Sequence, residues 1–207
     1  MRLMKERGWT VEGLEPSAEA ANPHGLDICH GTLESADFAP ESFDVVTAWA
    51  VFEHLHDPMR AFRHVERWLK RGGHLIIVVS NIKSLASRFA YQEDIPRHLY
   101  VFSEQTLAEY ARAVGLSLKT VTHDTRFFGG SGRGVVRVRL FQMLGGSPLG
   151  YFQAMKLPLA QRLRYYPLIA AAGVPLAALE RILMPDWLIC RLRLNGIILA
   201  MMQKPAA

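Results

Sequence analysis

The chain has 207 residues, of which 50% are hydrophobic and 21% are charged, as in an ordinary globular domain. This composition excludes a disordered tail and a fibrous repeat, and the length suits one domain with an embellishment. The two cysteines, Cys29 and Cys190, have no companion at a metal-binding spacing, so neither a disulfide framework nor a thiolate zinc site is expected. The first residues have no apolar run behind them, so they do not read as a secretory signal, and we expect a reducing, cytoplasmic setting.

Charge is distributed unevenly along the chain. Residues 1–125 carry 13 Lys and Arg against 17 Asp and Glu, whereas residues 126–195 carry 10 basic residues against only Glu180 and Asp186. Two interpretations of the basic stretch stay open: a solvated face, or a surface for anionic lipid or an acidic partner, since the stretch is also rich in apolar and aromatic residues. No basic-aromatic recognition module is present, so we expect no nucleic acid partner.

The first part of the chain predicts short strands that alternate with helices. Residues 1–7 should end a helix at Gly8, and strands are expected over residues 10–16, 26–30 and 43–52. Apolar positions at helical spacing predict a helix over residues 58–69, which the Lys-Arg-Gly-Gly sequence of residues 70–73 should close. A fourth strand is expected over residues 74–81.

The later part of the chain continues this alternation. Ser103 should cap a helix that ends at Gly115, and strands are expected over residues 116–124 and 195–205. The alternation predicts a doubly wound α/β domain. We divide the chain into a core (1–125), a basic, apolar, mainly helical insertion (126–194), and the final strand with its tail (195–207).

The insertion should consist of several short helices. Five prolines, each able to break a helix, lie within it: Pro148, Pro158, Pro167, Pro175 and Pro185. The longest uncharged run, residues 167–179, is 13 residues long, whereas a bilayer span takes about 20. The insertion is therefore expected to lie on a membrane surface at most, and not to cross a membrane.

Four sequence blocks follow the acid-ended first strand: HGTLESADF, FDVVTAWAVFEHLHDP, WLKRGGHLIIVVSN and IPRHLYVFSEQTLAEYARAVGL. In this order and at these separations they resemble class I S-adenosylmethionine-dependent methyltransferases, nearest to the branch of ubiquinone-biosynthesis O-methyltransferases. The resemblance covers residues 1–124 and the final strand. It implies a Rossmann-like sheet, mostly parallel with a C-terminal antiparallel strand, and S-adenosylmethionine as cofactor.

The resemblance also assigns residues to the cofactor. An acid at the carboxyl end of a strand can accept both ribose hydroxyl protons, and Glu15 occupies that place. Many relatives carry an aspartate where Thr32 stands, so the contact to the adenine amino group differs here. The ribose, adenine and methionine parts would together meet Glu15, Pro16, Thr32, Leu33, Glu34, Ala48 and Trp49.

Two histidines are the candidates for catalysis. His54, in the sequence VFEHLHDP, could remove a hydroxyl proton as the acceptor oxygen attacks the sulfonium methyl group. His98, near Asp94 and Arg97, is the second candidate and lies where related enzymes form a substrate lid. Some quinone-pathway relatives bind a metal through an additional acid, but that position is Ala50 here, so no metal is expected.

The first strand and glycine-rich loop of this family are absent from the sequence. We therefore expect an amino-terminally shortened form that binds S-adenosylmethionine poorly, an expectation that micromolar binding in calorimetry would contradict. The expected activity is methyl transfer to a small-molecule acceptor, with an aromatic or lipid-like hydroxyl as hypothesis. Two alternatives remain: a non-catalytic, membrane-associated scaffolding protein, and a nicotinamide-dependent oxidoreductase, which is disfavoured because the chain supplies no hydride-transfer site.

Overall fold

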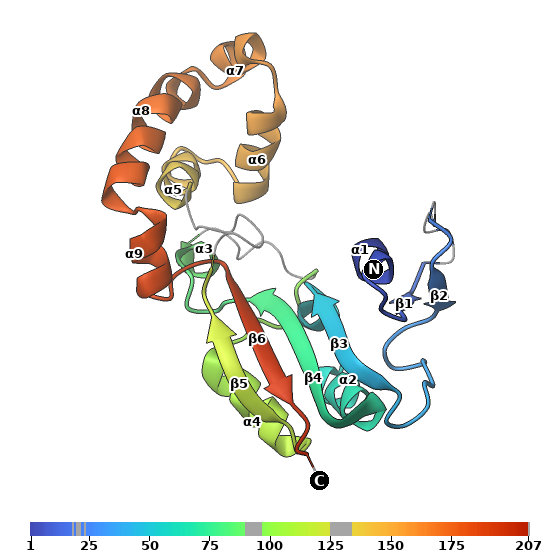
Figure 1. Cartoon of the computed structure of the whole chain (residues 1–207). Helices are drawn as coiled ribbons and strands as arrows, with labels where there is room; N and C mark the ends of the chain where they lie inside the picture. The colour runs from blue at the N-terminus through green and yellow to red at the C-terminus, as the bar shows by residue number, and fades with distance from the viewer. Residues whose placement is uncertain (18, 20–21, 23, 90–96, 125–133, 207) are drawn as a thin grey trace.

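A four-stranded mixed sheet forms the centre of the fold (Figure 1). The computed structural model describes residues 1–17, 19, 22, 24–89, 97–124 and 134–206. The sheet has the order β3-β4-β6-β5, with bounds Phe43–Trp49, Leu69–Ser80, Ile197–Gln203 and Ser117–Thr122. β3 and β4 are parallel, whereas β6 runs antiparallel to both of its neighbours. The expected α/β class and the antiparallel C-terminal strand are confirmed.

The first two strands form a separate parallel pair. β1 (Glu12–Glu15) pairs with β2 (Asp27–His30), and α1 (Arg2–Glu6) precedes them. The chain leaves α1 through Gly8, whose φ of 85° lies in the left-handed region that favours glycine. Within the described residues β1 pairs only with β2 and β3 only with β4.

The junction between α2 (Pro58–Trp68) and β4 corrects one expectation. Residues 70–73 do not close the helix, because α2 ends at Trp68 and β4 already begins at Leu69. Strand pairing decides this point: Leu69 pairs with Phe43, and Lys70 Nζ lies 2.8 Å from an Asp44 carboxylate oxygen. A Cβ at Gly73 would lie 2.8 Å from the Lys70 carbonyl oxygen, so the close approach of the chains requires glycine.

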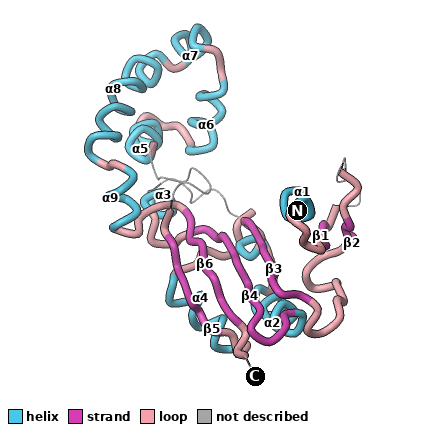
Figure 2. The backbone as a smooth tube through the Cα atoms, in the orientation of Figure 1, coloured by secondary structure: helices cyan, strands magenta, loops and turns pink. Residues whose placement is uncertain are grey.

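Two helices cover one face of the sheet (Figure 2). α2 packs on β4 and α4 (Glu104–Ala113) packs on β5. The side chain of Ser103 accepts the backbone N–H of Thr106, so the expected cap of α4 is confirmed. The fully buried side chains between these helices and the sheet belong to one core cluster, which includes Phe52, Phe62, Val65, Leu75, Ile77, Phe102, Leu107 and Ile198.

Helices occupy the described part of the chain between β5 and β6. They are α5 (Val135–Met143), α6 (Pro148–Lys156), α7 (Leu159–Tyr165), α8 (Pro167–Leu183) and α9 (Asp186–Arg191). We call residues 134–194 the helical region; residues 126–133 of the expected insertion lie outside the described residues. In the views of Figures 1 and 2 the helical region extends beyond the end of the sheet. Its assignment as an inserted unit, and the division at residues 125 and 194, stay predictions.

The prolines of this region have two different effects. Pro148 and Pro167 stand at the first position of a helix, where a missing N–H costs nothing, and Pro158 and Pro185 occupy N-caps. Pro175, by contrast, lies inside α8 without ending it, so its expected role as a helix breaker is wrong. No helix in the described ranges is long and apolar enough to cross a membrane.

A buried carboxylate joins α5 and α8 of the helical region. Glu180 on α8 is only 2% exposed and accepts the backbone N–H groups of Gly134, Val136 and Arg137 at 3.1, 2.9 and 3.2 Å. The Arg137 Nε atom lies 2.8 Å from the same carboxylate. Glu180 therefore caps the amino terminus of α5, and the Arg137 guanidinium and these N–H groups compensate the charge of the buried carboxylate. The same contacts fix the part of α8 that follows Pro175.

Candidate functional site

The carboxyl ends of β1 and β2 place the predicted ribose acid beside the predicted adenine segment. Glu15 pairs with His30 in the strand register, and the Gly31 backbone N–H donates to the Glu15 carbonyl oxygen at 3.0 Å. The half-buried Glu15 side chain accepts the Ser17 backbone N–H at 3.0 Å. That bond holds one carboxylate oxygen at the strand end, next to the exposed Pro16.

The segment after β2 is fixed by local hydrogen bonds and by packing. Ser35 Oγ accepts the Thr32 backbone N–H at 2.9 Å, which closes a turn. Leu33 is half-buried and packs against the main core, and the Glu34 carbonyl oxygen accepts an Arg60 N–H at 3.3 Å. The β1–β2 pair, the 31–35 turn and α2 are thereby connected, and Glu15 and residues 32–34 lie on adjoining parts of the chain.

The carboxyl end of β3 carries the residues predicted to meet the methionine part. Ala48 is half-buried and packs against the main core, whereas Trp49 is 45% exposed. Ala50 follows with a φ of 54°, an uncommon conformation for a residue other than glycine, and its N–H donates to the Val78 carbonyl oxygen at 2.9 Å. This turn leads the chain directly into η1 (Phe52–His54).

The two predicted catalytic histidines meet at this end of the sheet. The rings of His54 and His98 have centroids 4.7 Å apart, although the two residues are far apart in sequence. His54 Nδ1 lies 2.7 Å from the Arg97 carbonyl oxygen. A carbonyl oxygen only accepts, so Nδ1 carries the proton and Nε2 of a neutral His54 is left as the basic atom.

A buried carboxylate completes this group. Glu53 is 2% exposed, its Oε1 atom accepts the Ser80 hydroxyl at 3.3 Å, and its Oε2 atom has no hydrogen-bond partner among the described residues. The Glu53 backbone carbonyl oxygen also accepts the N–H groups of Leu99 and Tyr100 at 2.8 and 3.2 Å. These two bonds draw the segment that carries His98 onto η1, which explains how a remote loop reaches His54.

We call Glu53, His54 and His98 the Glu-His-His cluster. One potential ligand atom from each lies within 4.8 Å of the others, so the donor set fits a divalent cation of the kind that prefers nitrogen and oxygen ligands. The same arrangement also suits proton transfer, because a buried carboxylate stabilises an imidazolium next to it. Nothing in the sequence assigned Glu53 a role, and only its place directly before His54 hinted at one. Asp94, named with His98 in the sequence interpretation, lies outside the described residues.

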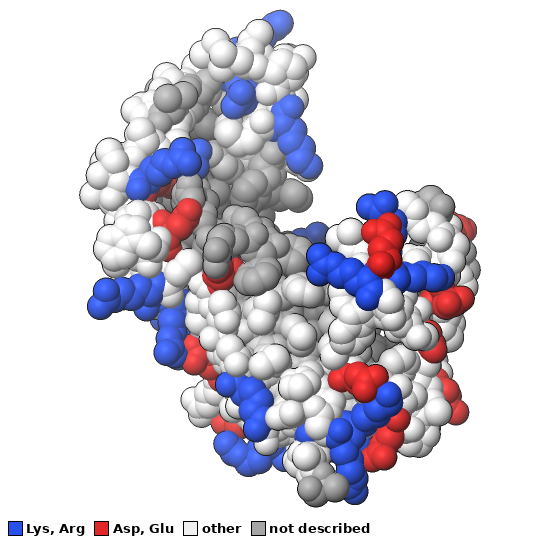
Figure 3. Space-filling model, in the orientation of Figure 1, with Lys and Arg blue, Asp and Glu red and all other residues white. Residues whose placement is uncertain are grey.

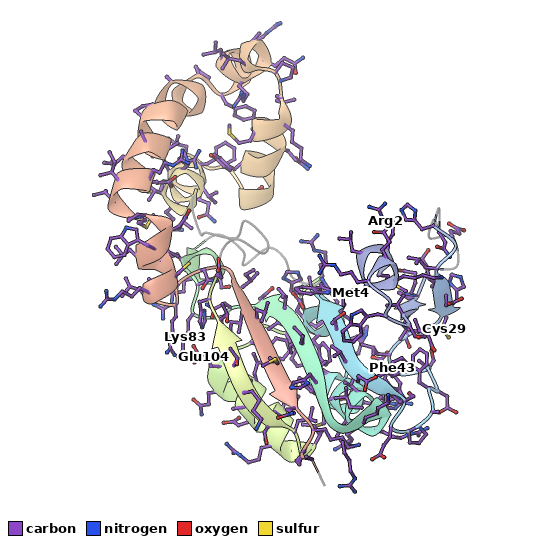
Figure 4. All side chains as sticks on the ribbon, in the orientation of Figure 1. Arg2, Met4, Cys29, Phe43, Lys83 and Glu104 are labelled. Atoms are coloured by element: carbon purple, nitrogen blue, oxygen red, sulfur yellow. The ribbon has the colours of Figure 1, made fainter. Side chains whose placement is uncertain are left out.

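A second polar network lies where α4, β5 and the end of the helical region meet (Figure 4). His123 Nε2 lies 2.7 Å from a Glu104 carboxylate oxygen and His123 Nδ1 lies 2.9 Å from Asn195 Oδ1. Arg193 Nη1 lies 2.8 and 2.7 Å from the two Glu104 oxygens. Burial acts to raise the pKa of the Glu104 carboxyl, but the His123 hydrogen bond and the Arg193 charge outweigh it and lower that pKa.

A pocket of about 690 Å³ adjoins this network. Its lining comes from the end of β5 and from α9 with the following residues, namely Val121, Thr122, His123, Asp124, Asp186, Trp187, Cys190 and Arg193. None of the residues predicted to bind the cofactor or to act in catalysis lines it. We therefore keep the ends of β1, β2 and β3 as the candidate functional site.

Comparisons with known proteins show the family of the chain. The sequence model of the methyltransferase domain family matches residues 1–121. The ubiquinone biosynthesis O-methyltransferase of Pseudomonas fluorescens is 28% identical over 138 residues, which are 57% of this chain and 60% of that protein. The chain therefore spans about 60% of the length of the curated relatives that it matches.

Solved structures agree in fold. A structure described as a putative sarcosine dimethylglycine methyltransferase from Galdieria sulphuraria has a TM-score of 0.56 at 13% identity, covering 99% of this chain and 73% of that one. An S-adenosylmethionine-dependent methyltransferase from Mesorhizobium loti has a TM-score of 0.55 at 13% identity, covering 98% and 84%. Since the family match extends over more than half of the sequence, the chain belongs to the methyltransferase domain family.

Proposed function

We propose that this protein transfers a methyl group from S-adenosylmethionine to a hydroxyl of an aromatic or lipid-like small molecule. The observation that carries the proposal is the meeting of His54 and His98 beside the buried Glu53 at the carboxyl end of β3. The matched O-methyltransferases of ubiquinone biosynthesis support an oxygen acceptor of this class. The cofactor, when bound, supplies a methyl group made electrophilic by its sulfonium.

The cofactor would be held by both sheets. Glu15 would accept hydrogen bonds from the ribose hydroxyls through the carboxylate oxygen that Ser17 leaves available, with Pro16 beside it. Thr32, Leu33 and Glu34 would border the adenine, Leu33 through its backbone N–H. Ala48 and the exposed Trp49 would border the methionine part. Charge-assisted bonds of the Glu15 kind are worth about 1.5–3 kcal/mol each.

His54 would act as the proton acceptor. Its Nδ1–H bond to the Arg97 carbonyl oxygen fixes the ring and would leave Nε2 available to take the hydroxyl proton of the acceptor. Glu53 would stabilise the imidazolium that results, because its buried carboxylate lies within reach of both rings. His98 would contact the acceptor or take the proton in the place of His54. Alignment of acceptor and methyl group supplies much of the remaining acceleration.

We propose that residues 126–194 contact an anionic membrane peripherally, since their net positive charge and apolar content suit a lipid surface that would also present a lipid-like acceptor. This contact is separate from the chemistry: methyl transfer to a water-soluble phenol needs no membrane.

The test is a methyl-transfer assay with radiolabelled S-adenosylmethionine. The full chain is incubated at high concentration with a catechol, a prenylated phenol and an amine, and products are extracted and identified by mass. We expect label on the oxygen of a phenol. Label on nitrogen alone would refute the acceptor class. If neither transfer nor cofactor binding is found, the alternative of a non-catalytic, membrane-associated scaffolding protein is favoured.

A further inference from the structure

We propose that the outer side of α8 and α9 is the part of the helical region that docks on an anionic phospholipid surface. We define the α8–α9 face by Leu179, Ile182, Leu183, Trp187, Arg181 and Arg191, all of them exposed. The inference deepens the peripheral contact proposed above and names the residues that would make it. It does not depend on the chemistry of the Glu-His-His cluster.

Large apolar side chains gather on this face. Ile182, Leu183 and Trp187 are 75%, 63% and 66% exposed. Leu179, Ile182 and Leu183 stand at i, i+3 and i+4 of one helix, so they share one side of α8. Single exposed leucines are ordinary, but several large side chains at the ends of two successive helices mark a site of interaction.

Cations accompany these apolar groups. Trp187 and Arg191 are four residues apart on α9, so the indole and the guanidinium project from the same side of that helix. Arg181 directly precedes Ile182 and stands two residues after Leu179, so it flanks the apolar side of α8 and does not lie on it. Throughout the described ranges neither Arg181 nor Arg191 forms an ion pair, so both charges stay available to a partner.

The acids of the helical region do not offset these charges on the surface. Glu180 is 2% exposed, and its carboxylate is bound by Arg137 and by three backbone N–H groups of α5. Asp186 is half-buried and lines the pocket next to β5. In Figure 3 the visible part of the helical region is mainly white and blue, with little red. The field above the α8–α9 face is therefore positive.

A bilayer surface matches both halves of this face. Anionic headgroups attract arginines, and each arginine near the surface contributes about 1 kcal/mol to the binding free energy. Trp side chains favour the level of the headgroups. Leucine and isoleucine side chains can enter the layer directly below.

The experiment is flotation of the full chain with vesicles, without any methyl acceptor. We expect the chain to float with vesicles of phosphatidylcholine and phosphatidylglycerol, to stay behind with phosphatidylcholine alone, and to be released by salt. Arg181→Gln with Arg191→Gln should weaken partitioning about 30-fold, at about five-fold for each charge. Ile182→Ser with Leu183→Ser should also weaken it, and the emission of Trp187 should shift to the blue on binding unless Trp187→Phe is introduced.

The control is Arg112→Gln with Lys119→Gln, which removes two exposed cations from α4 and β5. This variant should bind vesicles like the wild type. All these side chains are exposed, and circular dichroism melting verifies that each variant folds. Absence of flotation, equal flotation with neutral vesicles, or equal weakening by the control pair would overturn the proposal. Binding to an acidic protein without vesicle binding would do so as well.

The two proposals fail separately. A chain that methylates a soluble phenol but does not float refutes the lipid face alone. A chain that floats but transfers no methyl group refutes the proposed activity and leaves the lipid face standing.

Discussion

The Nδ1 atom of His54 lies 2.7 Å from the carbonyl oxygen of Arg97, a residue 43 positions further along the chain. One hydrogen bond thus fixes both the orientation and the tautomer of the imidazole. Backbone bonds from Leu99 and Tyr100 to the Glu53 carbonyl oxygen hold the two segments together at the same place. The candidate base is therefore positioned by the backbone, and side-chain substitutions near it can test its role without dismantling it.

His54→Ala should lower the rate of methyl transfer about 100-fold or more, because general-base catalysis contributes about that much. The effect should appear in kcat more than in KM, since His54 acts on the proton and not on binding. His56→Ala is the matched control, because His56 is exposed and only its backbone oxygen is bonded, to the Tyr100 hydroxyl. Equal loss in both variants would remove His54 from the mechanism.

Glu15→Gln should weaken binding of S-adenosylmethionine about 10-fold or more, since a neutral amide replaces a charged acceptor of ribose hydroxyls. Saturation-transfer NMR at millimolar cofactor detects weak binding and can compare the variants directly. Glu12→Gln is the control, because Glu12 stands on the same strand but is exposed. If the cofactor signal is unchanged in Glu15→Gln, the assignment of the ribose acid is wrong.

Methyl transfer should continue after a chelator has removed divalent metal, with rates within about two-fold, because the sulfonium needs no Lewis acid and alignment carries the rate. Plasma mass spectrometry should find no stoichiometric metal in the purified chain. The Glu-His-His cluster makes this a sharp test, since its donor atoms fit a cation. A visible cobalt spectrum that saturates at one equivalent, and that is lost in Glu53→Gln, would show that the cluster is a metal site and not a general base.

Glu104→Gln should lower the free energy of unfolding at neutral pH by about 1–2 kcal/mol, because it weakens the bonds to His123 and Arg193. The pKa of Glu104 is lowered in the folded protein, so its carboxylate stabilises the fold above the ordinary carboxyl range. That contribution disappears as the pH falls through the lowered pKa. Thermal unfolding should therefore show the difference between wild type and variant shrinking in acid.

Glu109→Gln provides the comparison for this stability test. Glu109 stands on the same helix, is exposed, and accepts only a Gln105 side-chain bond at 3.1 Å. Its substitution should leave both the midpoint of unfolding and its acid dependence nearly unchanged. A variant Glu104→Gln that unfolds like Glu109→Gln would show that the network adds no stability.

Local signals in the sequence predicted most elements of the fold. The cap at Ser103, the stop at Gly115 and the final strand β6 each reflect chemistry within a few residues, and each is confirmed. The predictions for residues 70–73 and Pro175 were wrong because contacts between distant parts of the chain decide the conformation there. Residues 70–73 extend strand β4 because β4 pairs with β3. Helix α8 continues through Pro175, and Glu180 beyond that proline accepts backbone N–H groups from α5.

For the candidate site, too, the sequence indicated some features and only the structure showed the others. The order of motifs singled out Glu15, residues 32–34, His54 and His98 as candidates, and their roles stay predictions. It did not reveal the buried Oε2 atom of Glu53 or the bonds that draw the His98 segment onto η1.

By itself, then, the sequence determined which residue types stand at strand ends and helix caps, and through them the family. Tertiary structure alone decided which distant residues meet, because contacts such as His54 with Arg97, or Glu180 with the amino terminus of α5, depend on how separate elements pack. Spacing along a chain specifies local conformation, whereas burial and partnership of a charge are properties of the assembled fold.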